Sequence, residues 1–482
     1  MIYVHWIFLL AYVVVVVSIM LAILMDNRQP AKTIAWVMVL LFMPVVGIVL
    51  YIFFGQNTRK MTFISQRSLD QLSKRSMLEF VEQRNLNVPE AYRTLIQLFT
   101  NQSLALPFKD NEVEFYTDGY SFFPELLKAM ARAHHHIHLD TYIIADDPLG
   151  RVVADTLIAK ASEGIEVRVI YDDVGCWRVP RSFFERMRRA GIEVSAFMPV
   201  KFPAFTSKVN YRNHRKVCVI DGTEAFIGGM NIALRYVKGI YGGKLPWRDT
   251  QMRIRGGAVY ALQRTFLVDW YFVDRTLVTS RAYYPPMPWH ISNNCLMQVV
   301  TSSPIAKWPD IMQGYVRILL EAKNYVYMET PYFLPTDSVL FAMRTAAIAG
   351  VDVRLMLPRH SDSRLLEISS MSYISEIVET GVKVKLYTAG FNHSKLLVAD
   401  DTLCTCGSTN IDFRSFENNF EANTFIYDRQ TTLRLKEIYL ADERKCDDFS
   451  LAANSANDSK TSRRPFMHRL AESFVRLFSP LL

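Results

Sequence analysis

The chain has 482 residues, of which 50% are apolar, so it exceeds one average domain. Lysine and arginine exceed aspartate and glutamate by eight (55 − 47), a balance that attracts anionic lipid or nucleic acid. There is no P-loop, dinucleotide fingerprint or C-x-x-C pair, which excludes the common nucleotide-binding and dithiol classes. The six cysteines lack the spacing of a disulfide framework, and we expect them to be buried thiols.

Two apolar stretches open the chain. Residues 1–25 and 33–58 contain no Asp, Glu, Lys or Arg, and each reaches the length of about 20 residues that a helix needs to cross a bilayer. We predict two transmembrane helices joined by a short turn, with a kink in the second at Pro44 and Gly47. A secretory signal is the alternative for the first stretch, but no basic start or small-residue cleavage site supports it.

Basic residues after the second stretch outnumber those in the turn before it. The turn has Arg28 and Lys32, whereas the following segment has Arg59, Lys60, Arg67, Lys74 and Arg75. The positive-inside rule therefore predicts that the main body lies in the cytoplasm.

From about residue 111, apolar strands alternate with helices, and the pattern occurs twice. Predicted strands are followed by predicted helices and then by G-[IV]-[ED]-V-R at Gly164 and at Gly350, an offset of 186 (350 − 164). The strands are 138–144 and 325–332, and the helices are 151–162 and 338–349. This repetition predicts two homologous α/β lobes with mostly parallel sheets, which can face each other across a pseudo-two-fold axis.

The pattern His-x-Lys-x4-Asp also occurs twice. An Asn follows each His by seventeen residues (231 − 214 and 410 − 393). One set is His214, Lys216, Asp221 and Asn231, and the other is His393, Lys395, Asp400 and Asn410. Two full matches with the same downstream Asn indicate a duplicated site, although any single Asp is compatible with a plain turn role.

Each motif enters a β-branched, apolar run that we predict to be a strand. Side chains two positions apart on a strand share a face, so His and Lys lie on one side and the Asp, five residues beyond the Lys, faces away. The Lys can neutralise a phosphate, and the His can act as a nucleophile or proton carrier near neutral pH. We expect each Asp to have a turn or supporting role.

Other polar residues lie where they could complete the site. A returning strand would bring Asn231 and Asn410 near a phosphoryl oxygen. Either Asp249 or Glu421 could orient an imidazole through its second nitrogen, and Arg414-Ser415 offers donors for an oxyanion.

At these residues the sequence resembles the phospholipase D superfamily, and the resemblance covers about residues 110–445. With its N-terminal apolar stretches and closing R-R-P-F-M-H-R-L, the whole chain resembles bacterial cardiolipin synthases of that superfamily. The resemblance implies one metal-independent phosphodiester site, with His214 as the nucleophile and His393 as general acid and base, although the reverse assignment is open. The first lobe departs from the usual G-S-x-N form because Gly229 stands where Ser408 stands in the second.

The resemblance further implies a multi-pass protein of the bacterial inner membrane that transfers a phosphatidyl group between two phosphatidylglycerol molecules. The products would be cardiolipin and glycerol, formed through a phosphohistidine intermediate. The implied partners are phosphatidylglycerol and other anionic phospholipids, with no cofactor, no metal and no nucleic acid. A D-G-x-x-A-R signature is absent, which disfavours a CDP-diacylglycerol donor.

Other functions are compatible with the same motifs. Water as acceptor would make the protein a phospholipase D-type hydrolase or, with nucleic acid as donor, a metal-independent nuclease; a non-catalytic lipid-binding scaffold is a third class. The histidines between 134 and 138 could suggest zinc, but we expect their side chains to diverge. The arginines between 178 and 189 fit a solvated helix face or a contact with anionic lipid.

We predict five segments along the chain. They are a two-helix membrane anchor (1–57), a linker (58–110), the first lobe (111–290), the second lobe (291–450), and a polar linker with an amphipathic C-terminal helix (451–482). The last helix could lie on the bilayer or pack on the body.

Overall fold

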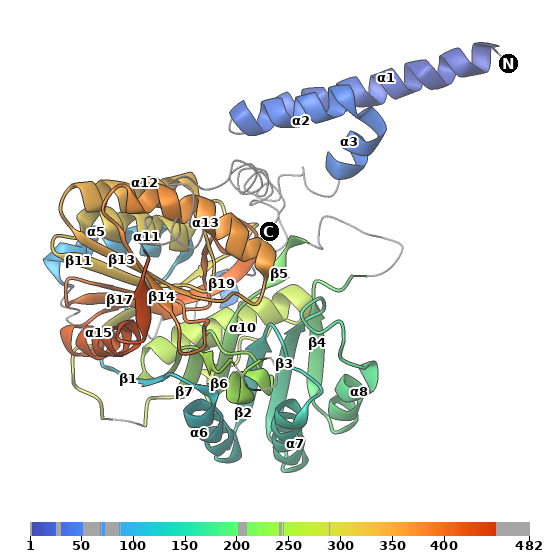
Figure 1. Cartoon of the computed structure of the whole chain (residues 1–482). Helices are drawn as coiled ribbons and strands as arrows, with labels where there is room; N and C mark the ends of the chain where they lie inside the picture. The colour runs from blue at the N-terminus through green and yellow to red at the C-terminus, as the bar shows by residue number, and fades with distance from the viewer. Residues whose placement is uncertain are drawn as a thin grey trace.

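The computed structural model describes residues 2–25, 30–51, 68, 70–72, 86, 88–200, 210–240, 243, 245–288 and 290–449. The predicted C-terminal helix lies outside these residues, as do the basic positions that follow the second apolar stretch. The two large sheets each carry their own helices, and further helices form the N-terminal end of the chain (Figure 1).

The N-terminal apolar stretches form α1 (Ile2–Met25), α2 (Pro30–Phe42) and α3 (Pro44–Leu50). The predicted kink in the second stretch is a complete break at Met43, whose backbone leaves the helical region (φ −135°, ψ 62°). Pro44 lacks a backbone N–H, so it suits the first turn of the new helix. In the part of the chain that the structure describes, no helix combines the length and the apolar character needed to cross a membrane.

The first lobe is built on a seven-stranded sheet in the order β1-β9-β7-β6-β2-β3-β4. Strand β2 pairs with β3, and β3 with β4, in parallel; the other neighbours are antiparallel. The strands are β1 (Asn111–Tyr116), β2 (His136–Thr141), β3 (Glu166–Asp172), β4 (Glu193–Phe197), β6 (Lys216–Ile220), β7 (Glu224–Gly228) and β9 (Gln251–Gly256).

The second lobe repeats this topology as β10-β19-β17-β16-β11-β13-β14, with β20 added at the edge. Its strands are β10 (Leu296–Ser302), β11 (Tyr325–Glu329), β13 (Asp352–Pro358), β14 (Lys383–Tyr387), β16 (Leu396–Ala399), β17 (Leu403–Gly407), β19 (Asn419–Tyr427) and β20 (Cys446–Asp448). The parallel and antiparallel pairs fall at equivalent places in both sheets. The predicted pair of homologous α/β lobes is confirmed.

The prediction of mostly parallel sheets is wrong. Strands β6 and β16, which follow the motif histidines, return at once through tight turns at Asp221-Gly222 and Asp400-Asp401 to form hairpins with β7 and β17. A hairpin is antiparallel by construction, and within the two large sheets the parallel pairs follow crossovers through helices, from β2 to β4 and from β11 to β14. The short turns are possible because these residues adopt positive φ angles.

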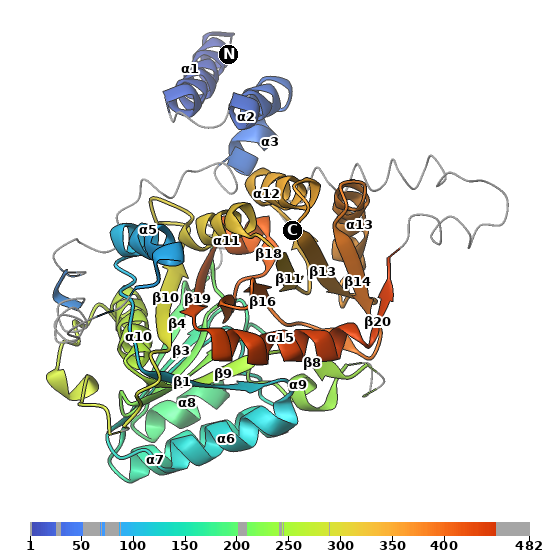
Figure 2. The same ribbon diagram turned by 90° about the vertical axis from the view of Figure 1, so that its left-hand side faces the viewer.

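Helices cover both sheets (Figures 1 and 2). The first sheet has α6 (Gly119–Ala131), α7 (Pro148–Ser162) and α8 (Arg181–Arg189) on its outer face, and the second has α11 (Asp310–Glu321), α12 (Asp337–Ile348) and α13 (Arg364–Val378). Helices α10 (Ala258–Asp274) and α15 (Arg429–Glu443) lie between the sheets. One hydrophobic cluster there joins Val219 and Leu262 of the first lobe to Val398 and Tyr439 of the second, so the lobes share a core.

The histidines at the start of β2 are part of the packing. His136 and His138 are buried on one face of β2 with ring centroids 4.5 Å apart, and both hydrogen-bond to Gln263 of α10. The expectation that these side chains diverge is therefore wrong for this pair. No group of three or more His, Cys, Asp or Glu among the described residues is arranged to hold a metal ion. All six cysteines are free thiols, and five of them are buried.

Candidate active site

Each motif histidine follows a short strand that pairs with the opposite lobe. Strand β5 (Arg212–Asn213) of the first lobe runs parallel to the start of β19, and β15 (Phe391–Asn392) of the second lobe runs parallel to β8 (Trp247–Arg248). The next backbone amides continue these pairs: His214 donates to the carbonyl of Phe420 at 2.9 Å, and His393 donates to that of Arg248 at 2.7 Å. Both histidines are thus fixed to the partner lobe.

This pairing brings each imidazole to an acid of the other lobe. Nδ1 of His214 lies 2.9 Å from Oε1 of Glu421, and Nδ1 of His393 lies 2.7 Å from Oδ2 of Asp249. Both carboxylates are fully buried. A carboxylate that accepts from Nδ1–H holds the imidazole in one tautomer and leaves Nε2 for chemistry. The sequence prediction that these two acids could orient the histidines agrees with the geometry, and the structure adds that the pairs cross between lobes.

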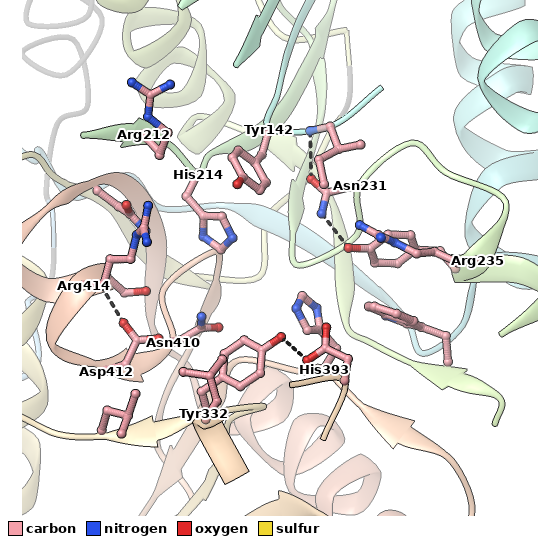
Figure 3. A pocket seen from close by; sticks show the side chains of 18 residues that line it. Tyr142, Arg212, His214, Asn231, Arg235, Tyr332, His393, Asn410, Asp412 and Arg414 are labelled. Atoms are coloured by element: carbon pink, nitrogen blue, oxygen red, sulfur yellow. Dashed lines mark hydrogen bonds between the residues drawn. The ribbon is translucent and has the colours of Figure 1, made fainter. Parts of the chain in front are cut away.

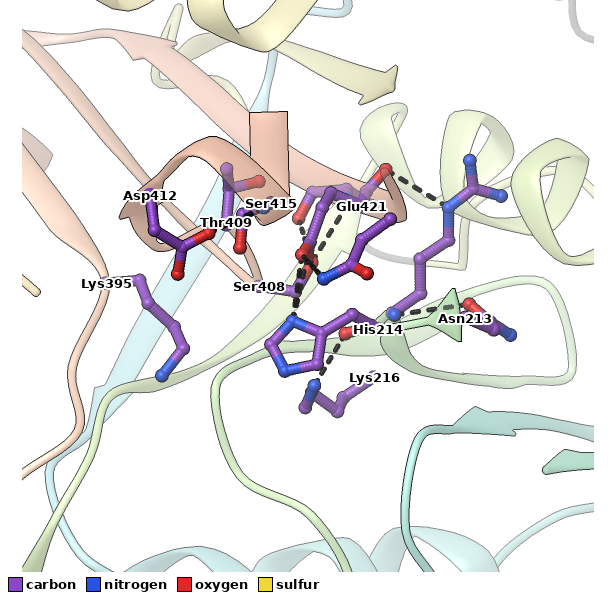
Figure 4. Close-up of polar contacts among 12 residues, drawn as sticks. Asn213, His214, Lys216, Lys395, Ser408, Thr409, Asp412, Ser415 and Glu421 are labelled. Carbon is purple, nitrogen blue, oxygen red and sulfur yellow. Dashed lines mark hydrogen bonds and ion pairs between the residues drawn. The ribbon is translucent and has the colours of Figure 1, made fainter. Parts of the chain in front are cut away.

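Each motif lysine contacts the histidine of its own motif. Nζ of Lys216 donates to the carbonyl of His214 at 2.6 Å (Figure 4). Nζ of Lys395 lies 2.8 Å from Nδ1 of His393. Burial lowers the pKa of Lys216 to about 7 and that of Lys395 to about 8, although Glu421 and Asp249 oppose the shifts. The ammonium groups are therefore poorly solvated charges, which an incoming phosphate would stabilise.

Burial also lowers the pKa of both imidazoles. For His393 the pKa falls to about 3, with Lys395 adding to the effect of burial and Asp249 opposing it. Burial lowers the pKa of His214 as well; Glu421 opposes this shift and Lys216 adds to it. Since both pKa values lie below the ordinary value of about 6.5, both imidazoles are neutral at pH 7.

Asp221 and Asp400 do not reach the site. Each has a positive φ and its carboxylate accepts three consecutive backbone N–H groups: His134, His135 and His136 for Asp221, and Lys323, Asn324 and Tyr325 for Asp400. Neither lines the pocket described below. Both carboxylates cap the backbone at the start of a strand, in keeping with the turn or supporting role expected for each Asp from its odd spacing after the Lys.

Ser408 and its counterpart Gly229 contact the orienting acids. The Ser408 hydroxyl donates to Oε2 of Glu421. A Cβ atom at Gly229 would lie only 2.1 Å from Oδ1 of Asp249. The first lobe therefore has glycine at this position because the carboxylate of Asp249 occupies the space that a serine side chain would need.

Both imidazoles line one pocket of about 250 Å³ (Figure 3). Asn231 and Asn410 line it too, as do Arg414 and Ser415 at the end of the second motif. Asn231 donates to the hydroxyl of Tyr236 at 2.5 Å and accepts from the amide of Ile143. The buried Oδ1 of Asn410 and Oγ of Ser415 have no hydrogen-bond partner among the described residues. Polar atoms without partners in a pocket are available to a bound ligand.

The comparisons with known proteins agree with this geometry. A family model described as "Cardiolipin synthase, PLD-like domain" matches residues 126–241 and 315–442, and a phospholipase D-nuclease N-terminal model matches residues 9–56. A cardiolipin synthase of Alkalihalophilus pseudofirmus is 38% identical over 474 residues, covering 97% of this chain and 92% of the relative. One from Listeria monocytogenes is 35% identical, covering 98% and 100%.

The chain belongs to the cardiolipin synthase family of phospholipase D-like proteins. This membership confirms the predicted superfamily and the predicted class of enzyme, a phosphatidyltransferase. Among solved structures, a phosphatidylserine synthase of Haemophilus influenzae superimposes with a TM-score of 0.59 at 14% identity, covering 82% of this chain and 100% of the other. At that identity the likeness shows the shared fold.

Two asparagines that support the site were not predicted from the sequence. Asn213 and Asn392 immediately precede the histidines, and their side-chain amides donate to the buried carboxyl groups of Asp140 at 2.6 Å and Glu329 at 3.1 Å. Burial raises the pKa of both carboxyl groups, that of Glu329 to about 8. A signal was present, since both motif copies read N-H-x-K. These asparagines hold the backbone from which each imidazole projects.

Proposed function

We propose that this protein makes cardiolipin by transferring a phosphatidyl group from one phosphatidylglycerol to another. The observation that carries the proposal is the single pocket lined by both His214 and His393, each backed by a buried carboxylate of the other lobe. Two imidazoles at one phosphorus atom can serve as nucleophile and proton carrier, which a phosphodiester exchange requires.

In the first step, Nε2 of His214 attacks the phosphorus of a bound phosphatidylglycerol. An N–P bond forms, the P–O bond to the headgroup breaks, and the leaving glycerol oxygen takes a proton from His393. His393 is neutral before the substrate binds, and it takes this proton from solvent when the anionic phosphate binds, because a nearby negative charge favours the imidazolium.

In the second step, a hydroxyl of a second phosphatidylglycerol attacks the phosphohistidine. His393 takes the hydroxyl proton as the new P–O bond forms, and the N–P bond to His214 breaks. The products are cardiolipin and glycerol, and His393 loses its proton to solvent when cardiolipin leaves, which returns the enzyme to its starting state. No metal or cofactor enters either step.

The surrounding residues supply charge and orientation. Lys216 and Lys395 neutralise the phosphate, while Glu421 and Asp249 hold the imidazole tautomers. Asn410 and Ser415 line the pocket beside Asp412, and a side-chain N–H of Asn410 and the hydroxyl of Ser415 would donate to the non-bridging phosphoryl oxygens.

We also propose that the N-terminal helices hold the enzyme at the bacterial inner membrane with the catalytic body in the cytoplasm. Large apolar side chains of α1 and α2, including Trp6, Leu10 and Leu41, are more than half exposed to solvent, and a bilayer would cover them. Retention of the protein in carbonate-washed membranes would support attachment, and its release into the wash would contradict it. Protease protection of the body in right-side-out vesicles would test the orientation.

Product analysis tests the proposed reaction. Purified enzyme incubated with phosphatidylglycerol should release glycerol and form cardiolipin, both detected by mass spectrometry. Phosphatidic acid as the main product would make the enzyme a hydrolase. Lipid turnover that persists in His214→Ala would point to a non-catalytic protein with a contaminating activity. Full activity is expected in excess chelator.

Trapping of the intermediate tests the roles of the two histidines. His393→Ala, given a p-nitrophenyl phosphodiester whose leaving group needs no proton, should accumulate the acid-labile phosphoryl adduct on His214, because the acceptor hydroxyl is no longer deprotonated. Label on His393 in the His214→Ala variant would establish the reverse assignment.

A further inference from the structure

Two arginines line the pocket as a symmetry-related pair. Arg235 follows Asn231 by four residues, and Arg414 follows Asn410 by four, so their separation equals that of the two histidines (414 − 235 = 393 − 214 = 179). Neither guanidinium forms an ion pair with a carboxylate among the described residues. The third arginine of the pocket, Arg212, is buried and paired with Asp172.

Arg235 lies on the side of the pocket that belongs to His393 (Figure 3). Its Cζ atom is 5.4 Å from the ring centroid of Trp247 and 5.7 Å from that of Tyr236. Those rings are in turn 5.1 Å and 6.2 Å from the ring of His393. Both aromatic residues are buried, so they form a rigid support that holds the exposed guanidinium at the pocket rim.

We propose that Arg235 binds the phosphate of the second phosphatidylglycerol, the acceptor, and thereby selects it over acceptors that carry no phosphate; this inference rests on the proposed function. The acceptor hydroxyl must reach His393 to lose its proton. Its own phosphate is tied to that hydroxyl by the three carbons of one glycerol, so it must lie on the same side of the pocket. A guanidinium without a carboxylate partner can bind a phosphate through two parallel hydrogen bonds.

Asp362, an acid that lines the pocket, favours the same orientation of the acceptor headgroup. Asp362 lines the pocket and accepts a hydrogen bond from the hydroxyl of Tyr332 at 2.8 Å, and the Tyr332 ring is 6.2 Å from that of His393. A carboxylate there repels a phosphate but can accept a hydrogen bond from the free hydroxyl of the acceptor glycerol. The two charges together would orient the acceptor headgroup with its phosphate toward Arg235.

Competition between two acceptors tests this assignment. Glycerol and phosphatidylglycerol offer the same type of hydroxyl, but only the lipid carries a phosphate. The full-length enzyme is given phosphatidylglycerol together with deuterated glycerol, and mass spectrometry follows cardiolipin and deuterated phosphatidylglycerol in one reaction. In Arg235→Gln we expect the ratio of cardiolipin to exchanged lipid to fall about tenfold or more, the effect of losing charge-assisted hydrogen bonds.

Two further variants make the result specific. Arg235→Lys keeps the charge without the planar fork and should recover part of the ratio. Lys238→Gln removes an exposed positive charge from the same short helix, α9 (Arg235–Lys238), outside the pocket, and should keep both rates. Thermal unfolding curves that match the wild type would exclude misfolding of the variants.

The outcomes that would overturn the inference are distinct from failure of the proposed function. Equal loss of both products in Arg235→Gln, with a normal unfolding curve, would assign Arg235 to the donor or to general architecture. An unchanged ratio would exclude a role in acceptor choice. Wild-type enzyme that exchanges glycerol but forms no cardiolipin would overturn the proposed function itself and the acceptor site with it.

Discussion

His214 and Glu421 are 207 residues apart in the chain, yet Nδ1 of the histidine lies 2.9 Å from Oε1 of the glutamate. The parallel pairing of β5 with β19 places them side by side, because the residue after each paired segment continues in the same direction. The equivalent pairing of β15 with β8 does the same for His393 and Asp249. Neither lobe alone contains a complete histidine and carboxylate pair.

We expect Glu421→Gln to lower kcat/KM by about a hundredfold or more, because a neutral amide no longer fixes the tautomer or stabilises the imidazolium of His214. Ser408→Ala removes only the hydroxyl that donates to Glu421 and should cost about tenfold or less. Initial rates of cardiolipin formation would measure both. Wild-type rates in Glu421→Gln would refute the orienting role of this acid.

Gly229→Ala should damage the other half-site. The added Cβ would lie 2.1 Å from Oδ1 of Asp249, so the carboxylate must move away from His393. We expect a loss of activity comparable to that of Asp249→Asn, and a lower free energy of unfolding by about 1–3 kcal/mol from overpacking. The reciprocal variant Ser408→Gly creates space instead and should be milder. Equal activity of Gly229→Ala and wild type would show that the site adapts to the extra atom.

The pH profile of kcat/KM should fall on the alkaline side between about pH 7 and pH 8. Burial lowers the pKa of Lys216 to about 7 and of Lys395 to about 8, and only the protonated amines neutralise phosphate, so activity is present below these values and lost above them. The phosphodiester substrate does not titrate in this range. Rates measured in constant-ionic-strength buffers check the prediction, and a flat profile from pH 6.5 to 9 would contradict it.

Asp221→Ala should destabilise the fold more than it slows the reaction. The variant removes a carboxylate that accepts three backbone N–H groups at the start of β2, at distances of 2.8–3.0 Å. We expect a loss of about 2 kcal/mol in the free energy of unfolding, measured in detergent by denaturant titration, with kcat of the folded fraction within about threefold of wild type. Asp400→Ala is the matched variant in the second lobe. A selective loss of kcat without loss of stability would restore Asp221 to the reaction.

Several features of the fold followed from local sequence patterns. The repeat of apolar strands and helices predicted two homologous lobes, and the odd spacing between Lys216 and Asp221 predicted that the Asp turns away from the site. Such features depend on strand periodicity and on turn residues, which are local properties of the chain. The same patterns predicted mostly parallel sheets, which is wrong, because a short apolar run does not show which neighbour it will pair with.

The residues of the reaction could be predicted from the amino-acid order: two histidines, two lysines and two asparagines at repeated spacings, with one acid farther along the chain after each set. The pairing of each histidine with its acid could not be predicted from the sequence. Chain order gives no reason for His214 to pair with Glu421 rather than with Asp249, which is far nearer in sequence. That choice is made by the shared core and by the two short parallel strand pairs that cross between the lobes, since distances between side chains depend on how the elements pack and not on their separation along the chain.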